Sequence, residues 1–289
     1  MEKRYAFFPG CVLTKAAAEA NTAIRAVAKA LGVELVELPG WSCCGASHVQ
    51  DVEPLAALTA NARNLALAEK IGAPLLTACS TCALMLRQAK SALDDGRKDE
   101  INAFLKAGKL TYNGTVTVTM LLWELAKDIP ALKAKVKKPL SKLQAAAFYG
   151  CHTVRPEADM GFESSATPKS FESVLTALGA TPAPFAKRLC CCGFHAVYPA
   201  EADVLKMTAE IVDCAAKAGA HCVVTPCPLC QMQLDMYLED AVKATGIKER
   251  VPALHLQQVV GLALGIPGKE LGLERNIVEL DRLKSIGLA

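Results

Sequence analysis

Short apolar runs alternate with longer segments of helical periodicity in the first half of the chain. The runs Tyr5–Pro9, Val33–Leu38 and Ala73–Ala78 have the length and composition of buried strands. Between them, apolar residues recur at helical spacing over residues 14–31 and 53–70, and a glycine follows each segment as a helix stop. The pattern therefore predicts three strands joined by two helices.

The pattern weakens after the third predicted strand. Ser80 is expected to cap a helix that continues to about Leu93. Residues 94–115 are polar and irregular, and Thr115–Thr119 is a possible fourth strand, followed by an amphipathic helix through Trp123.

The second half repeats this plan after a segment rich in Lys and Pro, residues 127–142, which we interpret as a linker. Strands are predicted over 143–149 and 221–225, and helices over 168–178, 201–218 and 228–244. Residues 254–264 mirror the segment after 116, and a closing helix is expected in 268–289. The chain is therefore expected to be an α/β protein of two pseudo-symmetric domains, 1–135 and 136–289, each a small parallel sheet flanked by helices.

Composition narrows the class of protein. The 289 residues are 52% hydrophobic and 21% charged with a net charge of +3, which indicates a globular protein and gives no basic run for nucleic acid. No apolar segment is long enough to span a membrane or to act as a signal sequence, so we expect a cytoplasmic protein with no direct membrane span. Thirteen cysteines in a reducing compartment favour metal or redox chemistry over disulfides.

Ten of these cysteines form one pattern that occurs twice. In each copy a single cysteine is followed by a Cys-Cys-Gly motif and then by Cys-x-x-Cys. The first cysteine set is Cys11, Cys43, Cys44, Cys79 and Cys82, and the second cysteine set is Cys151, Cys191, Cys192, Cys227 and Cys230. From Cys44 to Cys192 and from Cys79 to Cys227 the offset is 148 positions, which indicates an internal duplication.

Each cysteine group follows a predicted strand, so the five members of a set should meet at the carboxyl edge of a parallel sheet. Zinc takes four ligands, and a cubane [4Fe-4S] cluster takes four thiolates. Five thiolates leave two alternatives, a four-ligand site with a spare cysteine or a cluster that is not a simple cube. For Cys43 and Cys44 to reach one site the backbone must turn sharply, and Gly45 can adopt the positive φ that such a turn requires.

The tandem motif resembles the CCG-domain family, specifically the B subunit of heterodisulfide reductase and its relatives in sulfur-oxidising complexes. The similarity covers nearly the whole chain and includes the segments FFPGC, ACSTC, YGCHTVRP and TPCPLC. The resemblance implies a non-cubane [4Fe-4S] cluster in each half, held by all five cysteines of its set. It further implies cleavage or formation of a disulfide between the two clusters, as part of a complex.

Other residues are candidates for supporting roles. Lys15 and Arg155 stand four residues after the first cysteine of their sets, where a cation could offset a negative cluster or attract an anionic substrate, although solvated surface charges are equally expected. His152 follows Cys151 and could protonate a leaving thiolate. His48 and His195 follow the two Cys-Cys-Gly motifs and are weaker candidates.

The remaining cysteines and histidines are expected to have lesser roles. Cys190 could compete as a ligand, Cys214 and Cys222 are expected to be buried small residues, and His221 and His255 are expected to be structural.

No dinucleotide-binding, P-loop or ferredoxin-type motif is present, so electrons are expected to come from a partner. By resemblance, the partners are a C-like ferredoxin subunit and an A-like flavin subunit. The substrate could be a CoM-S-S-CoB-type disulfide, a lipoyl-protein disulfide or another thiol. Two rival functions remain: an electron carrier that binds no substrate, and a zinc-stabilised scaffold.

Overall fold

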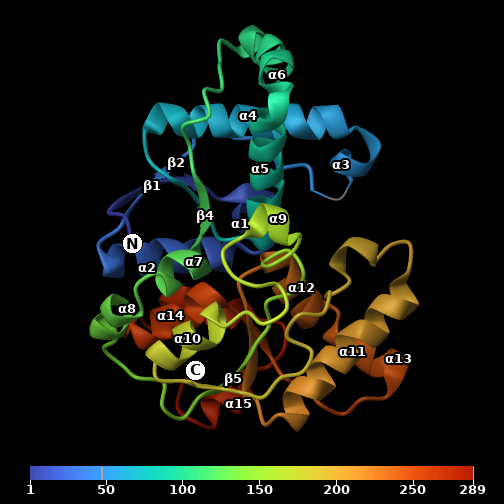
Figure 1. The fold of residues 1–289 in the computed structure, drawn as a ribbon. Helices are drawn as coiled ribbons and strands as arrows, with labels where there is room; N and C mark the ends of the chain where they lie inside the picture. The colour runs from blue at the N-terminus through green and yellow to red at the C-terminus, as the bar shows by residue number, and fades with distance from the viewer. Residues whose placement is uncertain (47, 289) are drawn as a thin grey trace.

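The computed structural model describes residues 1–46 and 48–288, which form two parallel sheets of four strands each (Figure 1). The first sheet has the order β2-β1-β3-β4 and the second the order β6-β5-β7-β8. The strands of the first sheet are β1 (Arg4–Phe8), β2 (Glu34–Glu37), β3 (Leu75–Thr77) and β4 (Val118–Met120), and those of the second are β5 (Gln144–Ala147), β6 (Thr181–Pro182), β7 (Cys222–Thr225) and β8 (Ala253–His255). The predicted α/β class with two parallel sheets flanked by helices is confirmed.

Helices cover both sheets. Those that follow the first sheet's strands are α1 (Gly10–Thr14), α2 (Ala18–Leu31), α3 (Val49–Val52), α4 (Pro54–Ile71), α5 (Ser80–Ala92), α6 (Lys98–Leu105), α7 (Leu121–Ala126) and α8 (Ile129–Lys135). Those of the second half are α9 (Glu157–Met160), α10 (Ser170–Ala177), α11 (Glu201–Lys217), α12 (Pro228–Met236), α13 (Leu238–Thr245), α14 (Leu256–Ala263) and α15 (Asp281–Lys284). Short helical turns are η1 (Leu93–Arg97), η2 (Lys106–Gly108), η3 (Phe194–Ala196), η4 (Gly268–Leu271) and η5 (Leu273–Arg275).

Several predicted elements differ from the structure. Ser80 is the first residue of α5, and Cys79 occupies the N-cap position, where its sulfur accepts from the Cys82 amide at 3.5 Å. The helix predicted over 228–244 is broken at Tyr237 into α12 and α13. The expected linker contains α8, because Asp128 caps its first turn.

The closing helix predicted for the tail is also wrong. Residues 268–288 form two short 3₁₀ turns and the four-residue α15. Glycines interrupt the segment, and Gly272 has a φ of +67°, which ends the first turn. The helical pattern of apolar residues in this tail instead lets Leu271, Leu273 and Leu283 pack into the core.

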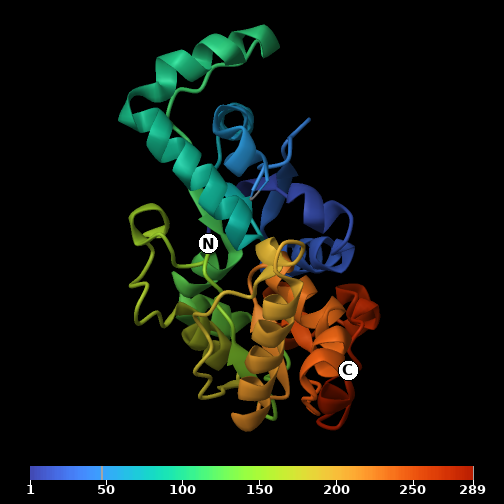
Figure 2. The ribbon, with the colours of Figure 1, turned by 90° about the vertical axis from the view of Figure 1, so that its right-hand side faces the viewer.

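The helix that follows the last strand of each sheet packs against the other half. α14 packs on α2, and α7 packs on α10, so each sheet's final helix covers a helix that follows the other sheet's first strand. Figure 1 shows the red-orange α14 beneath the blue α2. One continuous hydrophobic core runs through both halves. Figure 2 shows α6 at an angle to α5, and the backbone between them is not helical at Asp95 and Gly96.

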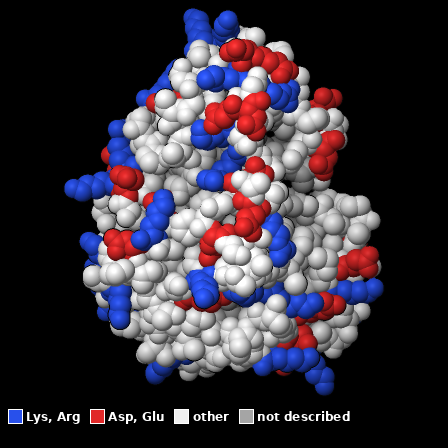
Figure 3. Space-filling view, in the orientation of Figure 1, with Lys and Arg blue, Asp and Glu red and all other residues white. Residues whose placement is uncertain are grey.

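Charge is distributed without a dominant sign. Lys and Arg are interspersed with Asp and Glu on the face shown in Figure 3. No helix in the described part of the chain has the length and apolar character required to cross a bilayer.

Candidate metal centres at the cysteine sets

The two cysteine sets lie at the carboxyl ends of their sheets. Cys11 and Cys151 follow β1 and β5 closely, and Cys79 and Cys227 follow β3 and β7. The Cys-Cys-Gly motifs lie in the loops after β2 and β6. Parallel strands thus deliver all ten sulfurs to corresponding edges of the two sheets, as the sequence predicted.

All five members of the first cysteine set line one cavity of about 290 Å³. Cys11 and Cys43 are exposed at its mouth, and the other three are buried. The Sγ atoms of Cys43 and Cys11 are 3.5 Å apart, and so are those of Cys44 and Cys82. Apolar side chains such as Val12 and Leu13 complete most of the wall. This cavity combines clustered sulfur donors with additional space.

All five members of the second set also line one cavity, which measures only about 10 Å³. The Sγ atoms of Cys151 and Cys191 are 4.0 Å apart. His152 and Tyr149 occupy the side of this cavity where the chain follows β5. The second set therefore has the same donors as the first and far less free volume.

Gly45 turns the chain as predicted, and Gly193 does the same in the second Cys-Cys-Gly motif. Gly45 has a φ of +71° and Gly193 a φ of +86°. The amide of Gly45 donates to the Cys43 sulfur at 3.4 Å, and that of Gly193 donates to the Cys191 sulfur at 3.3 Å. Each turn therefore brings adjacent cysteines to one site and supplies a hydrogen bond to the first sulfur.

A second pair of glycines permits close approach of the last cysteine in each set. Gly10 has a φ of +73°, and a Cβ added to it would lie 3.1 Å from the Cys82 sulfur. Gly150 has a φ of +68°, and its added Cβ would lie 3.1 Å from the Cys230 sulfur. These Gly-Cys steps were not singled out from the sequence, although they occur in both copies of the motif.

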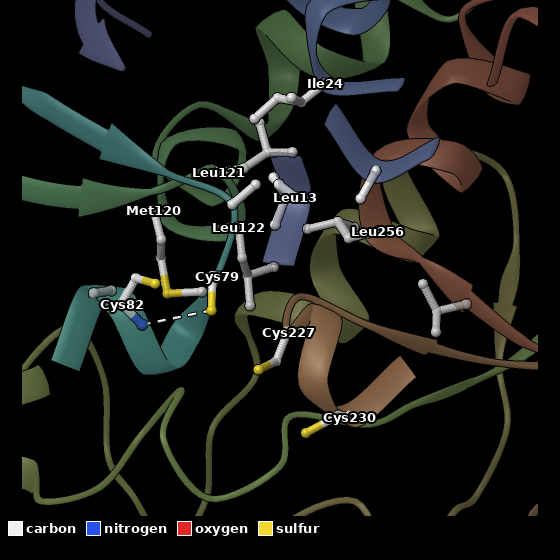
Figure 4. Packing of buried hydrophobic residues seen from close by; sticks show 14 of the residues in the cluster. Leu13, Ile24, Cys79, Cys82, Met120, Leu121, Leu122, Cys227, Cys230 and Leu256 are labelled. Atoms are coloured by element: carbon white, nitrogen blue, oxygen red, sulfur yellow. Dashed lines mark hydrogen bonds between the residues drawn. The ribbon is translucent and has the colours of Figure 1, made fainter. Parts of the chain in front are cut away.

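The two cavities share a wall. Thr81, Leu229, Phe194 and His195 line both of them. Figure 4 shows the sulfurs of Cys79 and Cys227 turned toward each other where the two Cys-x-x-Cys segments meet. The cysteine sets are consequently neighbours in one buried region.

Contacts that the sequence did not predict join the two halves near this wall. The Ser80 and Thr153 hydroxyl oxygens are 2.7 Å apart, and Thr81 Oγ1 lies 3.0 Å from His152 Nδ1. Thr81 Oγ1 is also 3.7 Å from the Cys227 sulfur. The signal was available in the sequence, because the residues between the cysteines are Ser-Thr in the first motif and Pro-Leu in the second.

The electrostatics of the crowded sulfurs favour a cation. Contact with the Cys11 sulfur lowers the pKa of Cys43 to about 2, and contact with Cys151 lowers the pKa of Cys191 to about 2. The hydrogen bond with Cys43 and burial raise the pKa of Cys44 to about 12. One cysteine per set is thus favoured as a thiolate, while neighbouring cysteines are favoured as protonated thiols. Binding of a metal group by all five sulfurs therefore requires the release of protons.

The predicted cations lie outside both cavities. Lys15 is exposed, and the exposed Arg155 donates to the Leu189 carbonyl at 3.2 Å; neither is among the described residues that line a cavity. His152 lines the second cavity and its ring centroid lies 5.5 Å from that of His195. Burial, followed by the nearby His152, lowers the pKa of His195.

The other predicted residues have structural surroundings. His48 lines the first cavity. Cys222 is fully buried, which raises its pKa to about 12, whereas Cys190 and Cys214 are half-buried. His221 accepts from the Gln144 amide at 3.0 Å, and His255 lies 3.2 Å from Glu19.

The donor set fits an iron–sulfur cluster better than a single ion. In residues 1–46 and 48–288, no three His, Cys, Asp or Glu side chains are grouped closely enough to hold one metal ion. A four-iron cluster spreads its thiolates over several irons, which suits five sulfurs around a cavity. The first cavity has room for such a group; the second set has the donors, but its side chains must move apart to admit one.

A family model described as a cysteine-rich domain, CCG, matches residues 5–87 and 145–235, which include every member of both cysteine sets. The chain belongs to this family. The predicted resemblance to the B subunit of heterodisulfide reductase is confirmed by the B subunit of a CoB-CoM heterodisulfide reductase from Methanosarcina acetivorans, which is 31% identical over 96% of this chain and 94% of that protein.

A second relative carries a different name. The 8-methylmenaquinol:fumarate reductase membrane anchor subunit of Wolinella succinogenes is 62% identical over 98% of this chain and 100% of that protein. A solved structure of a hypothetical protein from Helicobacter pylori matches with a TM-score of 0.80 at 18% identity. It covers 96% of this CCG protein, which spans about half (52%) of that chain, and it supports the fold alone.

Proposed function

We propose that this CCG protein is an iron–sulfur electron-transfer subunit of a quinol:fumarate reductase-type complex, with one [4Fe-4S] cluster at each cysteine set. The observation that carries the proposal is that two cavities, each lined by five cysteines, share one wall. The 62% identity to the W. succinogenes subunit over its full length selects the type of complex. This assignment favours the electron carrier among the functions inferred from the sequence.

The residues of this chain bind and separate the two clusters. When bound, the clusters would supply one-electron transfer. The exposed Cys11 and Cys43 place one side of the first set at the protein surface, where a redox partner can approach. Thr81 and Leu229 belong to the wall that both cavities share, and Cys79 of the first set interacts directly with Cys227 of the second.

An apolar ridge beside the first cavity is a suitable contact for another subunit. Val49, Val52 and Leu55 follow one another at intervals of three residues, and they are exposed by 45%, 76% and 39%. Phe104 is 50% exposed and shares a surface cavity with Leu55. Asp51 and Glu53 lie in the same segment and would be repelled by an anionic lipid surface, so we propose a protein partner that carries the next redox group.

The test compares the assembled complex with and without functional cysteine sets. Anaerobically purified protein should contain about eight irons and eight sulfides. The Cys44→Ala variant should abolish fumarate reduction driven by a methylated menaquinol, whereas fumarate reduction with a soluble artificial donor should persist. The Cys214→Ala variant, which changes a cysteine outside both sets, is the control. Stoichiometric zinc, or full quinol-dependent activity in Cys44→Ala, would reject the proposal.

A second candidate function is disulfide chemistry at the first cavity. The observation in its favour is that two members of the first set, Cys11 and Cys43, are exposed where the cavity opens. A site open to solvent there would suit a low-molecular-weight or lipoyl disulfide. Turnover of such a disulfide by purified protein with an artificial reductant, lost in Cys43→Ala, would support it; reduction of the clusters without disulfide turnover would exclude it.

A further inference from the structure

Two positions break the symmetry of the wall between the cysteine sets. Thr81 in the first Cys-x-x-Cys motif corresponds to Leu229 in the second, 148 positions later. His152, directly after Cys151, corresponds to Val12, directly after Cys11. Thr81 and His152 therefore form a polar pair, and the residues at the matching positions, Leu229 and Val12, form an apolar pair.

The polar pair reaches the second cysteine set from both halves. Thr81 comes from the first half, and its hydroxyl oxygen lies 3.0 Å from His152 Nδ1 and 3.7 Å from the Cys227 sulfur. Thr81 is 3% exposed, so solvent does not compete for these contacts. A hydroxyl group has one hydrogen to donate and can accept at the same time. The three groups therefore form a short chain that ends on a sulfur of the second set.

The apolar pair meets the first cysteine set. Leu229 and Val12 both line the first cavity, together with Cys79, which corresponds to Cys227. Neither side chain has a hydrogen-bond donor. At these two matched positions the side chains are therefore polar beside the second set and apolar beside the first.

The direction of the hydrogen bonds follows from the chemistry of a metal-bound sulfur. As a ligand, Cys227 is a thiolate and can only accept. The Thr81 hydroxyl is then the donor to this sulfur, which leaves its oxygen free to accept from Nδ1–H of His152. Hydrogen bonds to cluster sulfurs stabilise the additional negative charge of the reduced state.

We propose that Thr81 is a positioning residue that raises the reduction potential of the second cluster above that of the first by hydrogen bonding across the wall to Cys227. The proposal rests on the proposed function, since it requires a cluster at each set. The difference in potential sets the direction of electron transfer: an electron that enters at the more exposed first set moves to the second.

The test is a potentiometric titration of the anaerobically purified, cluster-loaded protein, with both clusters followed by EPR. Signals are assigned with Cys44→Ala and Cys192→Ala, each of which should lose one cluster. Thr81→Val removes the hydroxyl at nearly constant size and should weaken reduction of the second cluster about tenfold, which is about 59 mV for one electron. Thr81→Ser, which keeps the hydroxyl, should stay close to the original potential. Because Thr81 also lines the first cavity, both clusters are titrated, and the second cluster should shift more than the first in Thr81→Val.

A gain-of-contact variant keeps the proposal testable if Thr81→Val fails to hold its clusters. The double change Val12→His and Leu229→Thr installs the polar pair at the first set and should raise the potential of the first cluster by more than that of the second, whose cavity Leu229 also lines. An unchanged second cluster in Thr81→Val, an equal shift in Thr81→Ser, or no shift of the first cluster in the double variant would each overturn the proposal. Protein with zinc and no iron would instead reject the proposed function.

Discussion

The first cysteine set lines a cavity of about 290 Å³ and the second a space of about 10 Å³, although the same succession of strands and loops builds both. The second space has room for about one water molecule. The linings of the two spaces also differ outside the motif. Val12 stands in the first half where the larger His152 stands in the second, and His152 extends along the second set. A repeated ligand pattern therefore does not specify equal access.

The comparison also separates two ideas about function. Equal, open sites would suit one substrate held between both clusters, which the sequence alone suggested. One site with free space and one closely packed site suit entry at the first set and storage or relay at the second. The joint action of both halves on one substrate stays a prediction, and the experiments below distinguish the two ideas.

The largest effect is expected from removal of one buried cysteine in either set. Cys44→Ala and Cys192→Ala should each lose the cluster of their own set, about four irons, and keep the other. Because an electron must pass both sites, either variant should lose nearly all electron transfer through the complex. Iron and sulfide analysis with EPR checks the first expectation, and quinol-dependent turnover checks the second. Half-maximal turnover in one variant would make that set a side branch.

A smaller loss of iron and of stability is expected when the glycine before the first cysteine of each set is replaced by alanine. Alanine at Gly10 or Gly150 adds about 1–2 kcal/mol of strain because of the positive φ, and it also crowds Cys82 or Cys230. Gly72→Ala is the matched control, because its φ is +68° and no atom lies within 4 Å of an added Cβ.

Iron content and thermal unfolding of these three variants should separate strain from crowding. All three should lose comparable stability, but only Gly10→Ala and Gly150→Ala should lose iron, with the greater loss in the tighter second set. Equal iron loss in Gly72→Ala would show that backbone strain alone explains the result.

The thermal stability is expected to depend on pH through a carboxyl group at one of the two helix pairs that join the halves. Glu19 on α2 is buried and lies 3.2 Å from His255 and 3.0 Å from Arg275, both in the second half. In the other pair, Glu124 and Glu172 bond within their own halves. Burial raises the pKa of Glu19, but the bonds from His255 and Arg275 outweigh it, so the net pKa lies below its ordinary value of 4.5.

A carboxyl group with a lowered folded pKa stabilises the protein above its unfolded pKa, and this contribution disappears as the pH falls through the folded value. The unfolding temperature should therefore decrease below about pH 4.5. Glu19→Gln should cost about 1–3 kcal/mol at pH 7 and flatten this acid dependence. Thermal melts from pH 7 to pH 3 are the measurement, and Glu37→Gln, an exposed residue, is the control. An unchanged acid profile in Glu19→Gln would assign the dependence to other carboxyl groups.

The smallest change in electron transfer is expected from substitution of the two cations that were singled out from the sequence. Lys15 and Arg155 are exposed and line neither cavity in the described part of the chain, so alanine at either should change electron transfer by no more than about twofold. Arg155→Ala also loses its hydrogen bond to the Leu189 carbonyl, which lies in the loop before the second Cys-Cys-Gly motif. A tenfold loss in Lys15→Ala would place that cation on the path of a substrate or partner.

Apolar runs predicted β1, β3, β5 and β7 because these strands are largely buried, whereas β6 was not predicted as a strand. Tyr5, Ala6, Phe7 and Phe8 are fully buried, and their apolar run predicted β1. The ends of helices were harder to predict. The apolar pattern continues across Tyr237, so the break between α12 and α13 has no local signal of the kind that Gly32 gives at the end of α2.

The site was predictable where it depends on repeated motifs and not where it depends on contacts between the halves. The offset of 148 positions located the matching cysteines, and the glycine of each motif predicted its turn. The contact of Thr81 with His152 joins residues 71 positions apart in the chain, and only the packing of one half on the other creates it. Cavity volume is likewise a property of side-chain packing, which the motif does not encode.

The packing of α7 on α10 and of α14 on α2 has the geometry of a swapped pair, in which each of two equivalent partners packs the helix after its last strand on the other. Such an arrangement suits descent from a symmetric dimer whose two copies were later fused into one gene. In the dimer, every position was present twice, so a polar bridge across the axis would have been made twice or not at all. Fusion removed that constraint. A single chain can have Thr81 in one half and Leu229 at the matching position of the other. Selection can then act on a difference between the two cysteine sets.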